Sequence, residues 1–248
     1  MDTREYKLFY DRVGEDIGWD FSKLKCVTEG EKWQFYSLVA ERLSNTEIWL
    51  DIGIGGGEKV LQIANKSLLH IGIDISKGML KTAKNNLRNS KLKNVRFMRM
   101  DSDKLEFPDG FFDIITTRHC DFNTSEVFRT LKKGGYFLTQ QVEFKDKENF
   151  KEILGKSQMS EEKESIVKKY IEDFKRYGFE EVKVDYYNAK EYYQTIEDII
   201  FLLKNTPIVP DFGKQETDFE KLNRFIEKYT TNKGIVTNSH RSLIIARK

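Results

Sequence analysis

Short apolar runs that end beside an acidic residue recur along the first half of the chain. Three of them end at or next to Asp51, Asp74 and Asp101, and a fourth covers residues 111–117. Runs of this length, separated by stretches with apolar residues at helical spacing, are typical of buried parallel strands. The carboxyl ends of parallel strands meet at one edge of an open α/β sheet, where such sheets bind ligands. The three acids are therefore predicted to share a ligand-binding rim.

A glycine loop follows the first of these runs. Residues 53–57 read Gly-Ile-Gly-Gly-Gly, and apolar residues at helical spacing continue over residues 58–64. Gly53, Gly55 and Gly57 allow positive φ angles and let a ligand approach the backbone closely. The unpaired amides at the start of a following helix would face that ligand. This pattern predicts a strand, a tight loop and a helix built around a bound molecule.

Two classes of nucleotide cofactor use such a loop, and the spacing of its glycines separates them. In the dinucleotide fingerprint G-x-G-x-x-G, the third glycine would fall at position 58. The chain has Glu58 there, and its charge would point toward a pyrophosphate. Asp51, two residues ahead of the first glycine, instead suits a ligand that carries an ammonium group and no phosphates. Glycine loops beside an acid also occur as plain turns, so this segment alone leaves both interpretations open.

Asp74 stands at the carboxyl end of the second predicted strand. The segment after it has Met79, Ala83 and Leu87 at helical spacing, which predicts a helix. A carboxylate in this place can accept hydrogen bonds from both hydroxyls of a ribose. The alternative is that Asp74 caps the helix, although Ser76 can already do so.

The stretch from about residue 49 to residue 142 resembles the type 11 domain of the class I S-adenosylmethionine (SAM) dependent methyltransferases. The segments that carry the resemblance are WLDIGIGGG (49–57), GIDISKGML (72–80), MDSDKLEFPDGFFDII (100–115) and EVFRTLKKGGYFLTQQV (126–142). The resemblance implies an α/β fold with a Rossmann-like, seven-stranded methyltransferase sheet flanked by helices. It also implies SAM as the cofactor and methyl transfer as the activity.

The same resemblance implies which residues contact the cofactor. Asp51 and the glycines of the loop would hold the methionine part of SAM, and Asp74 would hold the ribose. Asp101 and Ser102 would face the adenine. The remaining implied contacts are apolar walls for the adenosine from Ile75 and Met79, and Arg118 or His119 beside the sulfonium.

The whole chain is expected to divide into a lid, a core that contains this stretch, and a cap. Residues 1–44 are rich in aromatic side chains and are expected to form a helical lid over the cofactor. Tyr6 and Tyr10 lie one helical turn apart, so both could face the site, and Tyr10 is a candidate substrate contact. Simple packing of these helices on the sheet is the alternative. Residues 45–187 are expected to form the core, including a charged helix over residues 146–177.

A helical cap is predicted over residues 188–238, between the last two strands of the sheet. Residues 239–248 are expected to form the final strand. The interval between the two strands is too long for a hairpin, and it contains an apolar helix around Phe201. This helix either packs on the core or walls a largely apolar small-molecule pocket, where Phe201 would contact the substrate.

Methyl transfer from a sulfonium is an in-line displacement, so the protein has to align a nucleophile and exclude water. An acceptor atom of high pKa also needs a base. His119 is the candidate for this catalytic base. Alternatively, His119 only forms a hydrogen bond next to the cofactor. Gln140 or Gln141, at the end of the fifth strand, could bind the substrate, with Gln141 the chosen candidate. His240 is a further candidate that could instead be structural, and Cys120 lacks the Pro-Cys turn typical of cysteine nucleophiles.

Composition and charge argue against several other classes of protein. Lys and Arg number 42 against 40 Asp and Glu, so no strong overall field would attract nucleic acid. The two cysteines cannot form a disulfide framework, and no C-x-x-C zinc pattern occurs. No apolar run approaches the roughly 20 residues of a membrane helix. A cytoplasmic protein without metal or membrane association is therefore expected.

The sequence thus predicts a SAM-dependent methyltransferase that acts on an oxygen or nitrogen atom of a small molecule. An RNA methyltransferase is the alternative, with RNA along the basic residues 81–93, although such a run is more often a solvated helix face. A non-catalytic SAM-binding or dinucleotide-binding protein is a further alternative. The pattern makes no prediction about the acceptor's identity or the oligomeric state.

Overall fold

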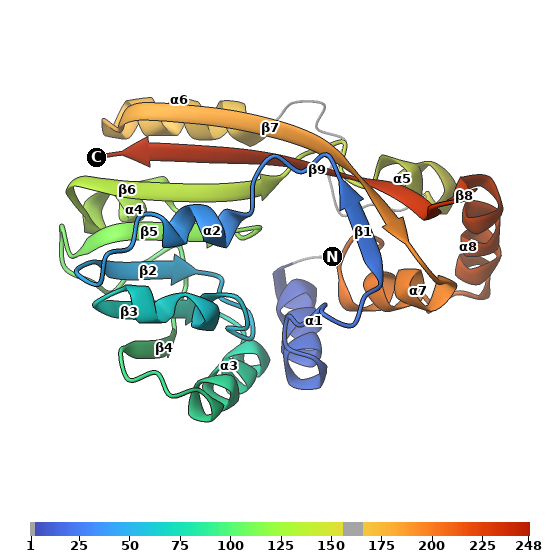
Figure 1. Cartoon of the computed structure of the whole chain (residues 1–248), viewed down its shortest axis with the longest axis horizontal. Coiled ribbons are helices and arrows are strands. Elements are labelled where there is room, and N and C mark those ends of the chain that lie inside the picture. Colours follow the sequence, from blue (N-terminus) through green and yellow to red (C-terminus); the bar gives the residue numbers. More distant parts are fainter. Residues whose placement is uncertain (1–2, 156–165) are drawn as a thin grey trace.

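The computed structural model describes residues 3–155 and 166–248. Within these residues, nine strands form one sheet with helices on both faces (Figure 1). The strands are β1 (Cys26–Glu29), β2 (Ile48–Ile52), β3 (Leu69–Asp74), β4 (Val95–Arg99), β5 (Phe112–Arg118), β6 (Leu131–Val142), β7 (Glu180–Tyr193), β8 (Thr230–Thr231) and β9 (Gly234–Arg247). The helices are α1 (Thr3–Asp16), α2 (Phe35–Ala40), α3 (Lys77–Asn89), α4 (Thr124–Thr130), α5 (Glu148–Leu154), α6 (Ile166–Tyr177), α7 (Ile196–Asn205) and α8 (Glu216–Tyr229).

The order of the strands identifies the core of the sheet. It runs β1-β7-β9-β6-β5-β2-β3-β4, and β8 pairs with β9. Strands β4, β3, β2, β5 and β6 are parallel, whereas β9 lies antiparallel between β6 and β7. Without the short strands β1 and β8, seven strands of the described part remain. The predicted Rossmann-like α/β sheet flanked by helices is therefore confirmed.

Alternate side chains of the parallel strands enter two apolar layers. Leu50 and Ile115 pack on one face with residues of α6 such as Phe174. Trp49 and Leu138 pack on the other face, in a cluster that includes residues of α2 and α3. All five of these side chains are fully buried. Burial on both faces explains why these strands appear in the sequence as nearly continuous apolar runs.

The amino-terminal segment contains a strand in addition to the two helices expected there. β1 lies between α1 and α2 and pairs with the outer end of β7, with Cys26 opposite Tyr193 and Glu29 opposite Lys190. A strand this short at the edge of a sheet is defined by its partner more than by its own sequence. This explains why the local pattern did not reveal it.

The helix predicted over residues 58–64 is not formed, and that prediction was wrong. Two short 3₁₀ turns, η1 (Val60–Gln62) and η2 (Ala64–Lys66), take its place before β3. Val60 and Ala64 are still fully buried, so the apolar spacing serves packing on the sheet. The glycine loop therefore does not open onto an α-helix whose first amides could face a ligand.

The two long strands β7 and β9 extend into the region predicted as cap. Helices α7 and α8 occupy residues 194–233 between them and pack with α5 in a third apolar cluster. Phe150, Ile199 and Phe225 are fully buried in this cluster. Figure 1 shows the resulting lobe at the far ends of β7 and β9. The cap thus has a small core of its own.

The charged helix predicted over residues 146–177 is seen as α5 and α6, and the middle of that range, residues 156–165, lies outside the described residues. Among the helices of the described part, none is both long enough and apolar enough to cross a bilayer.

His70 is buried in β3, and neither of its ring nitrogens has a hydrogen-bond partner. Its ring lies against Trp49, with the ring centroids 4.0 Å apart, and edge-on to Phe97 at 6.0 Å. Burial lowers the pKa of His70 from 6.5 to about 3. The fold therefore requires the neutral imidazole.

We expect the free energy of unfolding to fall as the pH is lowered from about 7.5 to about 5.5. Below the unfolded-state pKa, the unfolded chain takes up a proton on His70 that the folded chain cannot hold. The lower pH lies about one unit below the pKa of histidine in the unfolded chain. Between the two pH values, the wild type should therefore lose about 1.4 kcal/mol more of its free energy of unfolding than His70→Leu. Urea unfolding at both pH values measures it, and equal losses in the two proteins would show that the folded state protonates His70 normally.

Candidate functional site

Asp51, at the end of β2, is fully buried on the face of the sheet that α2 covers. Tyr36 of α2 donates a hydrogen bond to Asp51 Oδ2 over 3.2 Å, and Thr116 of β5 donates a short one to Oδ1. Burial raises the pKa of Asp51 to about 7, although the two hydrogen bonds and the nearby Arg118 oppose the rise. Asp51 therefore lies just below the rim, behind Tyr36.

The glycine loop follows directly and has the predicted backbone geometry. Gly53, Gly55 and Gly57 have φ angles of 75°, 58° and 78°, a region that other residues rarely adopt. The amide of Gly55 donates to Asp74 Oδ2 over 3.0 Å, which ties the loop to β3. A Cβ atom on Gly53 would lie 2.6 Å from Sγ of Cys120. The loop thus packs directly against the segment that follows β5.

Asp74 joins the glycine loop to the start of α3. Its Oδ2 accepts from Gly55, and its Oδ1 accepts from the amide of Ser76 over 2.9 Å. Each carboxylate oxygen has capacity for another hydrogen bond. Burial raises the pKa of Asp74 to about 6. Ser76 itself caps α3 by accepting from the amide of Met79 over 3.1 Å, which leaves Asp74 with capacity for a ligand.

The other residues expected at the adenosine differ in exposure. Ile75 is 44% exposed beside Asp74, whereas Met79 is only 2% exposed. Asp101 is exposed and Ser102 half-buried, just beyond β4. Ile75, Asp101 and Ser102 can therefore present surface at the rim, while Met79 supports it from below.

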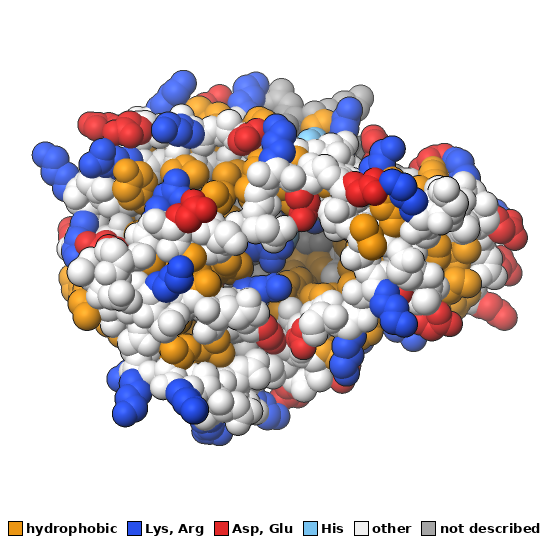
Figure 2. Space-filling view, in the orientation of Figure 1, with side chains coloured by type: hydrophobic (Ala, Val, Ile, Leu, Met, Phe, Trp, Pro, Cys, Tyr) orange, Lys and Arg blue, Asp and Glu red, His pale blue; other side chains and the backbone are white. Residues whose placement is uncertain are grey.

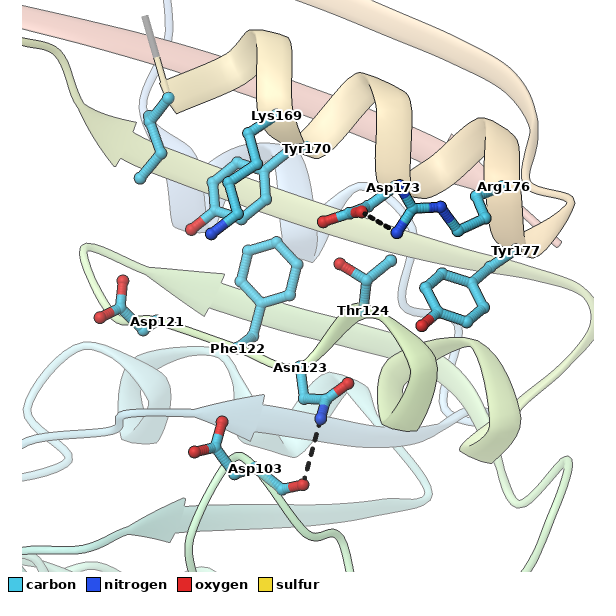
Figure 3. A pocket seen from close by; sticks show the side chains of 11 residues that line it. Asp103, Asp121, Phe122, Asn123, Thr124, Lys169, Tyr170, Asp173, Arg176 and Tyr177 are labelled. Carbon is cyan, nitrogen blue, oxygen red and sulfur yellow. Dashed lines mark hydrogen bonds and ion pairs between the residues drawn. The ribbon is translucent and has the colours of Figure 1, made fainter. Parts of the chain in front are cut away.

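A cavity of about 580 Å³ lies between α6 and the loops that follow β4 and β5 (Figure 3). Its wall includes Asp103, which follows the expected adenine contacts by one residue, and Asp121. Phe122 and Tyr170 stack within it, with ring centroids 4.6 Å apart. The cavity combines a flat aromatic surface with acidic and basic side chains.

Helix α1 is held against the amino end of α3, next to the rim. Asp11 Oδ1 accepts from Ser76 Oγ over 2.7 Å and from the amide of Gly78 over 3.2 Å. Gly14 and Gly78 allow the helices to touch, because a Cβ on either would overlap the backbone of the other helix. The position of α1 therefore depends on two glycines.

Aromatic side chains connect α1 with the cap. The rings of Tyr6, Tyr10, Trp19, Phe21 and Phe201 follow one another with centroid separations of 5.9, 5.6, 5.0 and 5.9 Å. Burial and then Tyr6, Cys120 and Asp74 raise the pKa of Tyr10, which shows how close this ring lies to the rim. Phe201, expected to contact a substrate, ends the row in α7.

His119 follows β5 in a left-handed conformation, with a φ angle of 58°. Its Nε2 lies 2.9 Å from Nε2 of Gln140, whose Oε1 accepts from Trp33 Nε1 over 2.8 Å. An indole N–H can only donate, so it fixes the Gln140 oxygen toward Trp33 and the Gln140 nitrogen toward His119. His119 Nε2 is then the acceptor, and the proton of the neutral ring is on Nδ1.

This arrangement does not suit the general-base role expected for His119. Burial and the cations Arg118, Arg241 and Lys147 hold the pKa of His119 well below its ordinary value, so the ring is neutral. Its acceptor nitrogen is already used by Gln140. The ring can therefore offer Nδ1–H to a ligand as a donor, and a tautomer change would set two N–H groups against each other.

The side chain of Gln141 points to the opposite face from that of Gln140. Its Nε2 donates to the carbonyl oxygen of Cys120 over 3.0 Å and to Thr139 Oγ1 over 2.8 Å. Gln141, the residue chosen from the sequence as a substrate contact, therefore supports the loop that follows β5. Burial raises the pKa of the Cys120 thiol, which argues further against a cysteine nucleophile.

His240 lies on β9, where its amide donates to Asp146 Oδ1 over 2.9 Å and its ring is 6.3 Å from that of Phe144. No hydrogen bond or ring contact in the described residues joins it to His119. Arg118, at the end of β5, is half-buried, and its Nε has no hydrogen-bond partner. Burial lowers the pKa of Arg118.

Several residues near the rim were not identified as site residues from sequence. They are Asp11, Trp33, Tyr36 and Arg241, whereas Gln140 was considered but Gln141 was chosen. The aromatic content of the amino-terminal segment was the only signal for Trp33 and Tyr36. In the described residues, no group of three or more His, Cys, Asp and Glu side chains could hold a metal ion.

Comparison with known proteins identifies the family. Residues 43–198 match the family model of a methyltransferase domain. The chain is 35% identical over 121 residues to the uncharacterized methyltransferase YcgJ of Bacillus subtilis, covering 46% of this chain and 47% of that protein. It is 35% identical over 100 residues to the ubiquinone/menaquinone biosynthesis C-methyltransferase UbiE of Vibrio vulnificus, covering 36% and 38%. The chain thus spans less than half the length of these curated relatives.

Solved structures share the fold. The crystal structure of YcgJ from Bacillus subtilis superposes with a TM-score of 0.63 at 21% identity, covering 86% of this chain and 97% of that one. The phosphoethanolamine N-methyltransferase 2 of Haemonchus contortus superposes with a TM-score of 0.57 at 19% identity, covering 100% and 58%. The family model covers more than half of the chain, and the glycine loop and parallel sheet lie within it, so the chain belongs to the methyltransferase domain family.

Proposed function

We propose that this protein is a SAM-dependent methyltransferase that transfers a methyl group to an oxygen or nitrogen atom of a small molecule. The observation that carries the proposal is Asp74, which ties the glycine loop to α3 and keeps capacity for two further hydrogen bonds. The Haemonchus relative was crystallised with S-adenosylhomocysteine (SAH). The phosphoethanolamine N-methyltransferase 2 of Caenorhabditis elegans is 33% identical to this chain over 97 residues.

The residues at the rim fit SAM. Asp74 would hold the ribose hydroxyls, and the exposed Ile75 would lie against the adenosine. Asp101 and Ser102 would face the adenine beside the cavity of Figure 3. The left-handed glycines would let the methionine part approach the backbone above Asp51. When bound, SAM supplies a methyl group that is already activated as a sulfonium.

The protein's own part is to orient the acceptor and to exclude water. Helix α1 and its aromatic row lie over the rim and can shield it from solvent, which supports the lid interpretation of this segment. His119 would hold the acceptor by donating from Nδ1, because Trp33 and Gln140 fix its tautomer.

The shape and charge of the surface favour a small acceptor over RNA. Figure 2 shows the molecule hollowed at its centre, between the sheet and the lobe of α7 and α8, with charges of both signs scattered around. The basic residues of α3 point into solvent, and Lys81 is paired with Glu15 of α1 at 3.2 Å. These features are typical of a solvated helix face.

Labelled methyl from SAM should enter the metabolite fraction of a cell extract when the protein is added. Fractionation into metabolites, RNA and protein identifies the acceptor class, with Asp74→Ala as the inactive control. Label in RNA would replace the small-molecule proposal by the alternative. SAH binding without label in any fraction would indicate a non-catalytic SAM-binding protein.

Asp74→Ala should weaken SAH binding by about 10- to 100-fold, because charged hydrogen bonds contribute about 1.5 to 3 kcal/mol. Titration calorimetry measures it. Asp109→Ala removes an exposed carboxylate from a distant turn and should leave the affinity unchanged. An unchanged affinity for Asp74→Ala would remove the ribose assignment.

Gly78→Ala should also weaken SAH binding if α1 is a lid, because the added methyl overlaps Asp11 and displaces α1 from α3. Proteolysis within α1 should become faster in parallel. Lys84→Ala, at an exposed position of α3, serves as the control for helix stability. If α1 loosens while the SAH affinity stays at the wild-type value, α1 packs on the fold without covering the cofactor.

A further inference from the structure

A strip of polar side chains crosses the carboxyl end of the sheet on the face that α2 covers. Arg118 of β5 is in register with Gln140 of β6, so their side chains share this face. Gln140 is opposite Leu243 of β9, and two residues away on β9, Arg241 is opposite Tyr187 of β7. Because residues two apart on a strand point the same way, these side chains follow one another across four strands. We call Arg118, Gln140, Tyr187 and Arg241 the polar strip.

Two cations at the far end of the polar strip already have carboxylate partners. Arg241 pairs with Asp146, and Lys147 pairs with Glu191. Lys147 also donates to the backbone carbonyl of Asn238 over 3.1 Å. All four charged side chains are largely buried, and each pair is neutral as a unit. These pairs hold the long strands in place and need no ligand.

Arg118 differs from both of these cations. Its Nε is buried without a hydrogen-bond partner, and none of the ion pairs in the described residues includes it. Its neighbour Tyr36 donates its hydroxyl proton to Asp51, and Arg118 forms no hydrogen bond with the Tyr36 oxygen. Arg118 as a whole is half-buried, but burying one of its guanidinium nitrogens without an acceptor is costly, and such uncompensated groups concentrate at functional sites. The structure therefore holds at the rim a positive charge that lies near the Asp51 carboxylate but, within the described part of the chain, forms no ion pair and no hydrogen bond from Nε.

The groups around Arg118 complete a site for an oxyanion. His119, the next residue, has its Nδ1–H fixed as a donor by Gln140 and Trp33. A guanidinium presents its N–H groups as a planar fork, which matches the oxygens of a carboxylate or a phosphate. Two adjacent residues can thus donate to one negatively charged group.

We propose that Arg118 binds an oxyanion, a carboxylate or a phosphate, that belongs to the methyl acceptor. The inference rests on the proposed methyltransferase function, which defines the acceptor. The strip extends from Arg118 toward β9 and β7, away from Asp74 on β3, so the anion anchors the acceptor on the side opposite the ribose site. Arg118 is then a substrate-binding residue, and not a wall of the sulfonium region as the family resemblance implied.

Calorimetric titration of inorganic phosphate into the full chain saturated with SAH tests this proposal, with acetate as the carboxylate probe. At constant ionic strength, Arg118→Gln should weaken binding of the better probe about tenfold or more. Arg118→Lys keeps the charge and should retain part of the affinity. Arg96→Gln removes the same charge from an exposed position of β4 and should bind the probe as the wild type does. Equal affinities of wild type and Arg118→Gln, or no detectable binding of either probe to the wild type, would overturn the proposal.

SAH titration separates the acceptor from the other source of a carboxylate, the methionine part of the cofactor. Arg118→Gln should bind SAH as tightly as the wild type, and a tenfold loss would assign Arg118 to the cofactor and overturn the proposal. The melting temperature of Arg118→Gln should be unchanged or higher, because no ion pair is lost. A marked fall would indicate a structural charge instead. If the wild type fails to bind SAH, the proposed function fails, while phosphate titration of the SAH-free protein still tests Arg118.

Discussion

The register of three parallel strands determines which residues meet at the rim. Asp51 is level with Gly72 on β3 and with Thr116 on β5. Two residues further along each strand, the chain reaches Gly53, Asp74 and Arg118. The left-handed glycine, the carboxylate and the guanidinium are therefore level with one another, although they are far apart in sequence. A register shift of one residue would turn Asp74 and Arg118 to the other face of the sheet.

The buried polar groups at this edge of the sheet differ in how many of their hydrogen bonds are formed. Asp51 has two donors in Tyr36 and Thr116, yet burial still raises its pKa to about 7. Asp74 is held by two backbone amides. Arg118 has no acceptor for its Nε. Burying an unmatched polar group lowers stability, and such groups cluster at functional sites. Burial thus disfavours the charged forms of Asp51, Asp74 and Arg118 alike, and Arg118 differs from the two carboxylates in having a buried polar atom without a partner.

The sequence revealed the parts of the site that depend on local chemistry. The glycine loop, Asp74 and the parallel strands were predicted because each has a pattern within a few residues. The helix over residues 58–64 was wrong, since buried 3₁₀ turns show the same apolar spacing. The choice between Gln140 and Gln141 depends on which face each side chain takes, and a shift of one residue reverses it. Only the structure shows which of the two side chains lies on the face that α2 covers.

The contacts that no sequence pattern could show are those between distant elements. The glycine contact between α1 and α3 needs Gly14 and Gly78 to lie opposite each other in space. The aromatic row needs α1 and α7 to approach from opposite ends of the chain. Because this row runs from the rim to a cap with its own apolar core, a shift of α1 would also disturb the packing of Phe21 on α7. The position of α1 at the rim and the packing of α7 in the cap are therefore physically linked through the same side chains.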